Sequence, residues 1–363
     1  MTTKGERVHS DLPVPPGEIL AEEIEARGMT QRELAARLGR PPQVINEIIR
    51  GKKAITPDTA IGLCQVLDIE ASYWMNLEAD YQMTLARERS QAAMSEQEQW
   101  LSQYPVRELI KRGWIEAGRD RASRVRALMS FLGVASIEPR VYQEAVGFRI
   151  TDAAREKISL GALGAWLRKG ELVAESIETA DYDADAFRGA LAQIRNLTAE
   201  PPEEFVPKME ALCAGAGVAF CVVPELPKLG ANGAARWLND RKALIQMNIR
   251  GKWADVFWFS FFHEAGHLLR HRHQRRIVVD GLDVDPDAAS IEEEADEFAR
   301  DFLIPSAQWR DFSNSDYFDA RDVHKFAHSI GIAPFIVVGR LQKEKLVPYN
   351  RLSAMKQRYQ WSH

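Results

Sequence analysis

Apolar residues recur every three or four positions along the first quarter of the chain, which predicts a series of short amphipathic helices. Thr30 followed by Glu33 has the form of a capping box, and Thr56 followed by Pro57 is typical of a helix start. We expect a five-helix bundle over residues 17–87, preceded by a flexible polar arm at 1–16. Glycine suits a helix C-terminus, and the first three predicted helices each end before one: Gly28, Gly39 and Gly51.

The helical pattern continues through residues 88–200, where the sequence carries no chemical motif. Helices are expected near 106–112, 121–133 and 162–177. We interpret this stretch as a helical connecting region or scaffold.

β-prone runs begin only after Pro201 and Pro202, where the composition shifts. Turns rich in Pro, Gly and Asn-Asp separate three such runs and predict a small antiparallel sheet. A long helix, a second helix and a helical C-terminal part follow. The fold class is therefore mostly α, with an α+β domain at 201–350 and a tail at 351–363. The predicted strands are 217–223, 234–238 and 243–247, and the predicted helices are 252–271 and 291–303.

The composition is ordinary for a globular chain of 363 residues, with 45% hydrophobic and 27% charged residues. A net charge of −5 does not suggest a protein coated in nucleic acid, so DNA contacts would need a local basic patch. The three cysteines have no CxxC spacing, which argues against a disulfide framework and a cysteine zinc site. The N-terminus has no apolar core and the longest apolar run is 256–262, so we expect a cytoplasmic protein with no membrane partner.

The strongest motif is His263-Glu264-Ala265-Gly266-His267, within the predicted long helix. Residues four apart lie on one face of a helix, so both imidazoles can reach one ion, and this HExxH pattern favours Zn2+. Glu264 would then act as general base toward a water molecule that attacks a peptide carbonyl. The alternative is a surface helix that carries the string by chance, and the apolar turns before His263 argue against it.

A catalytic zinc needs a third protein ligand and one open position. Glu292 adjoins the apolar face marked by Ala295 in the acidic stretch 290–299, and we predict it as that ligand. Asp296 lies four residues further along the same face and is placed to hydrogen-bond one of the histidines.

Other interpretations of this acidic stretch are structural. Ser290 and Glu293 have the spacing of a capping box. Glu294 is the second choice of ligand, although acidic residues in a first helical turn also suit the helix dipole without binding metal.

The remaining histidines are expected to be capping or solvated residues. His271 and His273 lie near the end of the predicted helix, where a cation complements the dipole. His324 and His328 are one turn apart, but no acidic pattern supports a second metal site there. One of these histidines, Arg340 or a tyrosine is a candidate for stabilising the oxyanion.

A local basic patch lies where the second and third helices of the bundle meet, joined by the turn Gly39-Arg40-Pro41. This arrangement predicts a helix-turn-helix that binds a double-stranded DNA operator as a homodimer. The alternative is a helical bundle used for protein contacts. The residues expected at base edges are Arg40, Gln43 and Asn46, and those expected at phosphates are Gln31, Lys52 and Lys53.

Residues 17–82 resemble the HigA-type antitoxins of the XRE/Cro class. The resemblance implies an antitoxin-like transcriptional regulator and makes a toxin a candidate partner. It rests on Thr30-Gln31, Ile45-Asn46-Glu47-Ile48, Ile55-Thr56-Pro57-Asp58-Thr59-Ala60 and Trp74-Met75-Asn76-Leu77-Glu78.

Residues 205–350 resemble the ImmA/IrrE family of metallopeptidases. The resemblance implies a zincin-like hydrolase domain that cleaves a protein substrate of the helix-turn-helix repressor kind. Because both parts share one chain here, it leaves open whether the substrate is the chain's own linker, a partner or another protein. It rests on the HExxH motif, on Glu292-Glu293-Glu294-Ala295-Asp296-Glu297-Phe298-Ala299 and on Leu303-Ile304-Pro305.

Three functional hypotheses remain. The first is a DNA-binding regulator with a selective zinc endopeptidase domain. The second is a non-catalytic antitoxin or repressor whose C-terminal domain senses a ligand or binds a toxin. The third is a general peptidase that the DNA-binding domain merely localises. Glu264→Gln separates the first two, and broad digestion of unrelated proteins would favour the third.

Overall fold

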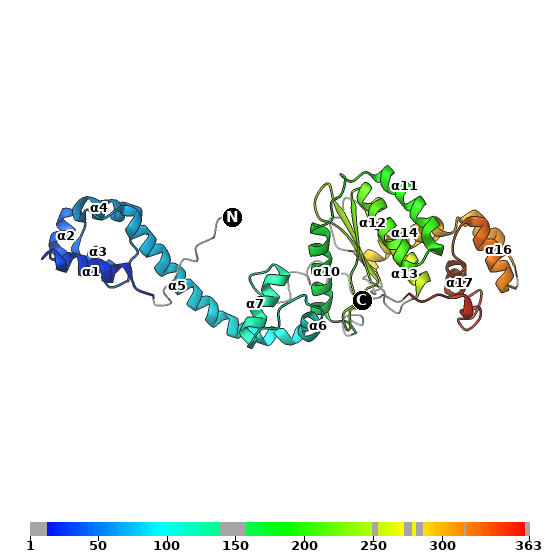
Figure 1. Ribbon diagram of the computed structural model, residues 1–363, viewed down its shortest axis with the longest axis horizontal. Helices are drawn as coiled ribbons and strands as arrows, with labels where there is room; N and C mark the ends of the chain where they lie inside the picture. Colours follow the sequence, from blue (N-terminus) through cyan, green and yellow to red (C-terminus); the bar gives the residue numbers. More distant parts are fainter. Residues whose placement is uncertain are drawn as a thin grey trace. The chain divides into compact units, whose positions relative to one another are not determined.

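A computed structural model of the protein describes residues 13–137, 157–248, 253–271, 278–280, 286–315 and 317–359. The chain divides into two compact units, residues 1–96 and 97–363. Both are mainly helical and the second contains a small sheet, as the sequence predicted (Figure 1). Among the helices described, none is long and apolar enough to cross a membrane. The segment boundaries expected at 16, 87, 200 and 350 stay a prediction.

The first unit is the predicted helical bundle, and its helix starts follow from the predicted caps. The Thr30 hydroxyl accepts a hydrogen bond from the Glu33 backbone N–H at 3.2 Å, and the Thr56 hydroxyl accepts one from Thr59 at 3.4 Å. Trp74 is fully buried among the aliphatic residues of the other helices. The helices are α1 (Pro16–Ala26), α2 (Gln31–Arg37), α3 (Pro42–Ile49), α4 (Pro57–Leu67) and α5 (Ala71–Gln97).

The second unit contains a four-stranded sheet in the order β1-β3-β2-β4. Its pairings correct the antiparallel prediction in one place. β2 pairs with β3 and β4 in antiparallel fashion, but β1 lies parallel to β3, with Phe220 opposite Ile245. Both β1 and β3 have side chains buried on both faces, which suits a parallel pair. The strands are β1 (Val218–Val222), β2 (Gly233–Trp237), β3 (Ala243–Met247) and β4 (Val278–Asp280).

Helices of the expected connecting region pack within the second unit. α10 (Leu160–Glu175) lies against β1 and β3. The Trp166 indole N–H donates to the Val223 carbonyl at 3.0 Å, and the Gln246 amide donates to the Trp166 carbonyl at 2.7 Å. Glu171 forms an ion pair with Arg236, a largely buried residue on β2. The neighbouring helices are α6 (Val106–Lys111), α7 (Arg121–Leu132), α11 (Ala184–Arg195) and α12 (Pro202–Gly215), with short 3-10 helices η1 (Glu98–Gln103) and η3 (Asn196–Ala199).

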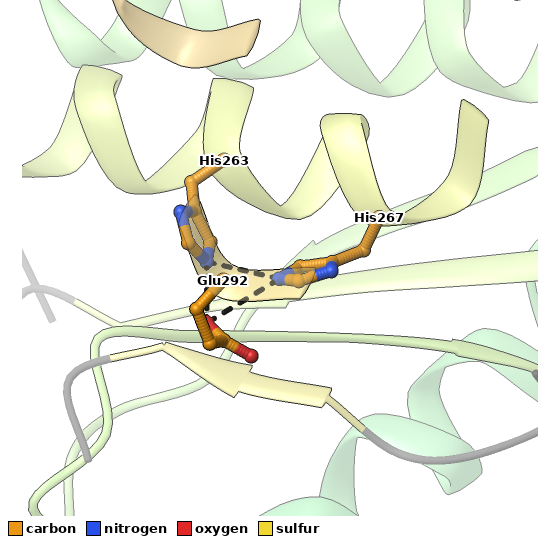
Figure 2. A group of neighbouring side chains, drawn as sticks. All are labelled: His263, His267 and Glu292. Atoms are coloured by element: carbon orange, nitrogen blue, oxygen red, sulfur yellow. Dashed lines mark hydrogen bonds and ion pairs between the residues drawn. The ribbon is translucent and has the colours of Figure 1, made fainter. Parts of the chain in front are cut away.

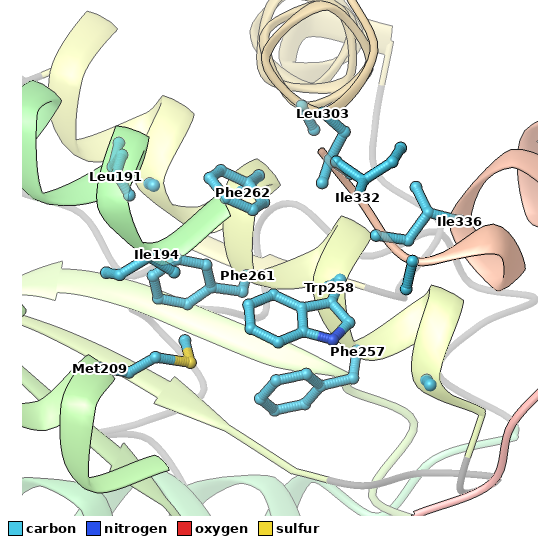
Figure 3. Packing of buried hydrophobic residues seen from close by; sticks show 14 of the residues in the cluster. Leu191, Ile194, Met209, Phe257, Trp258, Phe261, Phe262, Leu303, Ile332 and Ile336 are labelled. Atoms are coloured by element: carbon cyan, nitrogen blue, oxygen red, sulfur yellow. The ribbon is translucent and has the colours of Figure 1, made fainter. Parts of the chain in front are cut away.

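The centre of the second unit is α13 (Ala254–Arg270), which packs against the sheet and against α14 (Pro286–Leu303). Aromatic residues on α13 fill the core (Figure 3). The Trp258 indole N–H donates to the Tyr359 hydroxyl at 2.8 Å, so the last described residues contribute to this core. The remaining elements are α15 (Ser306–Ser313), α16 (Ala320–Ile330), α17 (Pro334–Lys343) and η5 (Ser353–Met355). This packing fixes the helix that carries the HExxH motif.

Candidate metal centre and DNA-reading helix

The HExxH motif lies in the last two turns of α13 and is buried. His263, Glu264 and His267 expose only 2%, 0% and 3% of their surface. Polar side chains this deeply buried need partners or a ligand, because an unsatisfied polar group in the core is costly. A chance motif on a surface helix would be exposed, so the burial rules out that alternative.

α14 brings Glu292 to the two histidines. The Glu292 Oε2 atom lies 3.1 Å from His263 Nε2 and 3.6 Å from His267 Nε2, and the two Nε2 atoms are 3.0 Å apart. Figure 2 shows both imidazoles projecting from α13 toward this carboxylate. In the part of the chain that the structure describes, these three residues form the one group whose ligand atoms converge within 4.8 Å.

The start of α14 differs from the prediction. The helix begins at Pro286 rather than near Ile291, so Ser290 lies inside it and forms no capping box with Glu293. Proline is favoured at a first helical position, and this start signal outweighed the Ser-x-x-Glu spacing. Glu293 is exposed.

Asp296 hydrogen-bonds His263 from the side opposite the cluster, as the sequence suggested. Its Oδ1 atom lies 2.8 Å from His263 Nδ1. A carboxylate accepts, so Nδ1–H is the donor, and this tautomer leaves the Nε2 lone pair available to an ion.

His267 has a different partner, which sequence reasoning missed. Its Nδ1 atom lies 3.4 Å from His271 Nδ1, and His271 Nε2 lies 3.1 Å from Glu294 Oε2. If the Glu294 carboxylate accepts from His271 Nε2–H, then His271 Nδ1 can accept from His267 Nδ1–H. The chain of donors again leaves the Nε2 atom of His267 unprotonated. The i, i+4 spacing of the two histidines was the available signal.

The ionisation of the cluster follows from its burial. Burial lowers the pKa of His267 below its usual range. Burial alone would raise the pKa of Glu292, but the contacts of its carboxylate with the imidazoles of His263 and His267 outweigh burial and lower this pKa to about 2. A neutral imidazole beside an ionised carboxylate is the form that binds a cation.

We expect the metal-free chain to lose stability in acid in two steps. Below a pH of about 6.5 the unfolded state takes up a proton on His267 that the folded state refuses, so the free energy of unfolding falls. Glu292 contributes a second loss between a pH of about 4.5 and about 2. Urea unfolding at a series of pH values measures both. His267→Gln should flatten the first step, whereas His328→Gln, at an exposed histidine, should retain it; identical profiles for the two variants would contradict the assignment.

Gly233 on β2 lies directly against Glu264 and was not singled out from the sequence. A Cβ atom at this position would lie 3.0 Å from Glu264 Cγ and 2.8 Å from Met247 Sδ. The missing side chain therefore allows the sheet to approach the motif closely.

The remaining candidate residues from the sequence that the structure describes do not belong to the cluster of His263, His267 and Glu292. Arg340 donates to the carbonyl groups of Arg300 and Ile304 at 3.2 and 3.0 Å, which commits its guanidinium to the end of α14. His324 and His328 are exposed on α16. His273 falls outside the described residues.

In the first unit, α2 and α3 pack together with the short turn expected of a helix-turn-helix. The Asn46 amide donates to Gln31 Oε1 at 3.2 Å, and the Gln43 amide donates to Glu47 at 3.0 Å. The first contact links a predicted base-edge residue on α3 to a predicted phosphate-contact residue on α2, and the second lies within α3. Gln43, Lys52 and Lys53 are exposed, and Gln31, Arg40 and Asn46 are half-buried.

Two family models match this chain. A model described as helix-turn-helix matches residues 20–74, and one described as an IrrE N-terminal-like domain matches residues 231–342. The second match contains His263, Glu264, His267 and Glu292.

Two curated proteins are similar to part of the chain. The chain is 36% identical over 80 residues to virulence-associated protein I of Dichelobacter nodosus, which covers 22% of this chain and 74% of that protein. It is 32% identical over 63 residues to the HTH-type transcriptional regulator YddM of Escherichia coli, which covers 17% and 67%.

Solved structures are also similar to part of the chain. An addiction module antidote protein of the HigA family from Coxiella burnetii is 33% identical, with 23% of this chain and 92% of that one covered and a TM-score of 0.22. The antitoxin HigA of Pseudomonas aeruginosa, solved with the higBA promoter, is 33% identical, with 22% and 86% covered and a TM-score of 0.21.

Proposed function

The chain belongs to the helix-turn-helix family of DNA-binding regulators and carries an IrrE N-terminal-like domain, and from this premise we propose that it couples operator binding to zinc-dependent cleavage of a regulatory protein. The observation that carries the peptidase part is the convergence of His263, His267 and Glu292 around one point beside the buried Glu264. Two imidazoles and one carboxylate are the ligand set of many catalytic zinc sites, and they leave one position open.

The donor set fits zinc in its chemistry. Zn2+ binds neutral imidazole nitrogen and carboxylate oxygen, and the hydrogen bond to Asp296 fixes the required tautomer of His263. The low pKa of Glu292 keeps its carboxylate ionised at neutral pH. We propose His263, His267 and Glu292 as ligands and Asp296 as the residue that orients His263.

When bound there, zinc would supply Lewis-acid activation of a water molecule and of the scissile carbonyl. Glu264 accepts a proton from the attacking water and then delivers it to the leaving amine. The buried setting of Glu264 between α13 and Gly233 holds the carboxylate in place and keeps bulk water from it. Metal analysis of the purified full chain, together with Glu264→Gln and Glu292→Ala, tests this proposal.

We expect His271→Leu to weaken zinc binding. The change removes the acceptor for His267 Nδ1–H, so His267 can place its proton on the ligand nitrogen instead. Loss of a residue that hydrogen-bonds a metal ligand typically lowers the metal affinity by about 10- to 100-fold. Competition with a calibrated chelator measures the affinity.

Two further variants separate this effect from general damage. His271→Asn keeps an acceptor and should retain more of the affinity. Glu293→Ala removes an exposed acidic residue next to Glu294 and should bind zinc like the unaltered chain. Unchanged affinity in His271→Leu would show that the contact with His267 has no positioning role.

The DNA-binding part of the proposal places α3 in the major groove of an operator, with the chain acting as a homodimer. The exposed Gln43 and the half-buried Asn46 lie on α3, and the exposed Lys52 and Lys53 follow it. A helix-turn-helix repressor is the substrate class that we propose for the peptidase, and a toxin is a further candidate partner.

We expect Asn46→Ala to weaken binding to the operator by roughly 5- to 150-fold, the cost of one lost base contact. Lys52→Ala should instead weaken binding to every DNA sequence and lower the salt dependence by about one unit of slope. Fluorescence anisotropy with the promoter of the chain's own gene and with unrelated DNA distinguishes the two effects. Lys111→Ala, at an exposed residue on α6, is the control. Equal losses on both DNAs in Asn46→Ala would contradict a role in base recognition.

A further inference from the structure

A cavity of about 760 Å³ lies in the second unit beside the metal cluster. Its position follows from α13: Val256, Phe259 and Ser260 line it, and they precede His263 by seven, four and three residues. Residues at these spacings share one helix face, so the cavity runs along the face that carries His263. Its volume is that of a site for a small ligand or a short peptide segment.

Two contacts join the cavity to the cluster. Phe259 packs beside His263, with ring centroids 6.4 Å apart. Asp296, which hydrogen-bonds His263, also lines the cavity. The cavity therefore borders His263 on the side of its Nδ1 atom, next to the proposed cleavage site.

Most charges in the cavity wall are already matched. The Lys356 Nζ atom lies 2.8 Å from Asp255 Oδ2, and Arg340 Nε lies 2.8 Å from Glu344 Oε1. These ion pairs offer little net charge to a ligand.

Arg300 differs from these residues. It is half-buried on α14, one turn after Asp296, and lines the same cavity. Within the described parts of the chain, no carboxylate lies within ion-pair distance of its guanidinium, and no other interaction engages that side chain. The walls nearby are apolar and include Leu303 and Ile336, both visible in Figure 3. A half-buried guanidinium without an ion pair, next to these apolar residues, is suited to bind a carboxylate through charge-assisted hydrogen bonds.

We propose that this cavity receives a carboxylate of the substrate peptide and that Arg300 binds it, which makes Arg300 a specificity-determining residue. The inference rests on the proposed peptidase function and names its substrate class, a peptide that is acidic next to the scissile bond. The carboxylate can come from a Glu or Asp side chain or from a free C-terminus.

Peptide hydroxamates test the proposal without any cleavage step. The hydroxamate chelates the zinc of the loaded full chain, and the probes carry Glu, Gln or Met beside it with an amidated C-terminus. A fourth probe carries Met with a free C-terminal carboxylate. Isothermal titration calorimetry measures each affinity for the unaltered chain, for Arg300→Gln and for the control Arg310→Gln, at an exposed residue on α15.

We expect the Glu probe or the free-carboxylate probe to bind about 10- to 100-fold more tightly than its uncharged counterpart, the value of one charged hydrogen bond. Which of the two binds more tightly identifies the source of the carboxylate. Arg300→Gln should remove the preference and Arg310→Gln should keep it. Equal affinities for all probes, or a preference that survives in Arg300→Gln, overturn the inference while the metal site stands. A chain that loads no zinc and binds no hydroxamate overturns the proposed function and this inference with it.

Discussion

Glu264→Gln should reduce proteolysis by about 10²- to 10⁴-fold, the usual contribution of a positioned general base. The amide has nearly the shape of the carboxylate but cannot accept the proton of the attacking water. New N-termini, mapped by mass spectrometry after incubation of the zinc-loaded chain with an extract of its own cells, measure the activity on partners and on the chain itself.

The variant and the unaltered chain must be compared at equal zinc content. Glu264→Gln should contain as much zinc as the unaltered chain, because Glu264 is not among the converging ligands. Glu293→Gln, at an exposed position, should remain active. Equal cleavage by the Glu264→Gln variant and the unaltered chain would remove Glu264 from the mechanism. A zinc-loaded chain that produces no new N-termini under any condition would favour the non-catalytic repressor.

Glu292→Ala should lose zinc. The change removes one of the three proposed ligands. We therefore expect the zinc affinity to fall by more than the roughly 10- to 100-fold caused by losing a hydrogen-bond partner of a ligand. At a zinc concentration of about 100 times Kd, the unaltered chain should gain about 2.7 kcal/mol of stability, and this gain should disappear in the variant. Metal content by mass spectrometry and melting temperature with and without zinc measure both.

The hydrogen bond between Asp296 and His263 provides a matched control for this experiment. Asp296→Ala removes the partner of His263 rather than a proposed ligand, so its affinity should fall between that of the unaltered chain and that of Glu292→Ala. Full zinc occupancy in Glu292→Ala would show that the third ligand is a different residue.

The convergence of His263, His267 and Glu292 could be predicted because their helices carry local signals. The four-residue spacing of His263 and His267 fixes their common face on any helix, and the apolar periodicity after Ala295 fixed the face of Glu292. The contact of His271 with Glu294 depends on how α13 and α14 cross, and no spacing within one segment encodes that angle. The parallel register of β1 and β3 was missed for the same reason, since it depends on packing between distant segments.

The attachment of α10 to the sheet limits how this IrrE-like domain can be transferred between proteins. The IrrE-like match begins at residue 231, yet the ion pair of Arg236 and the backbone contacts of Gln246 end on residues 166–171. A gene fragment that begins at residue 231 would lack α10, and Arg236 and Gln246 on the sheet would lose their partners. Recombination that conserves this packing must therefore transfer α10 together with the matched region. The segment that has to be inherited together is longer than the segment that the family model matches.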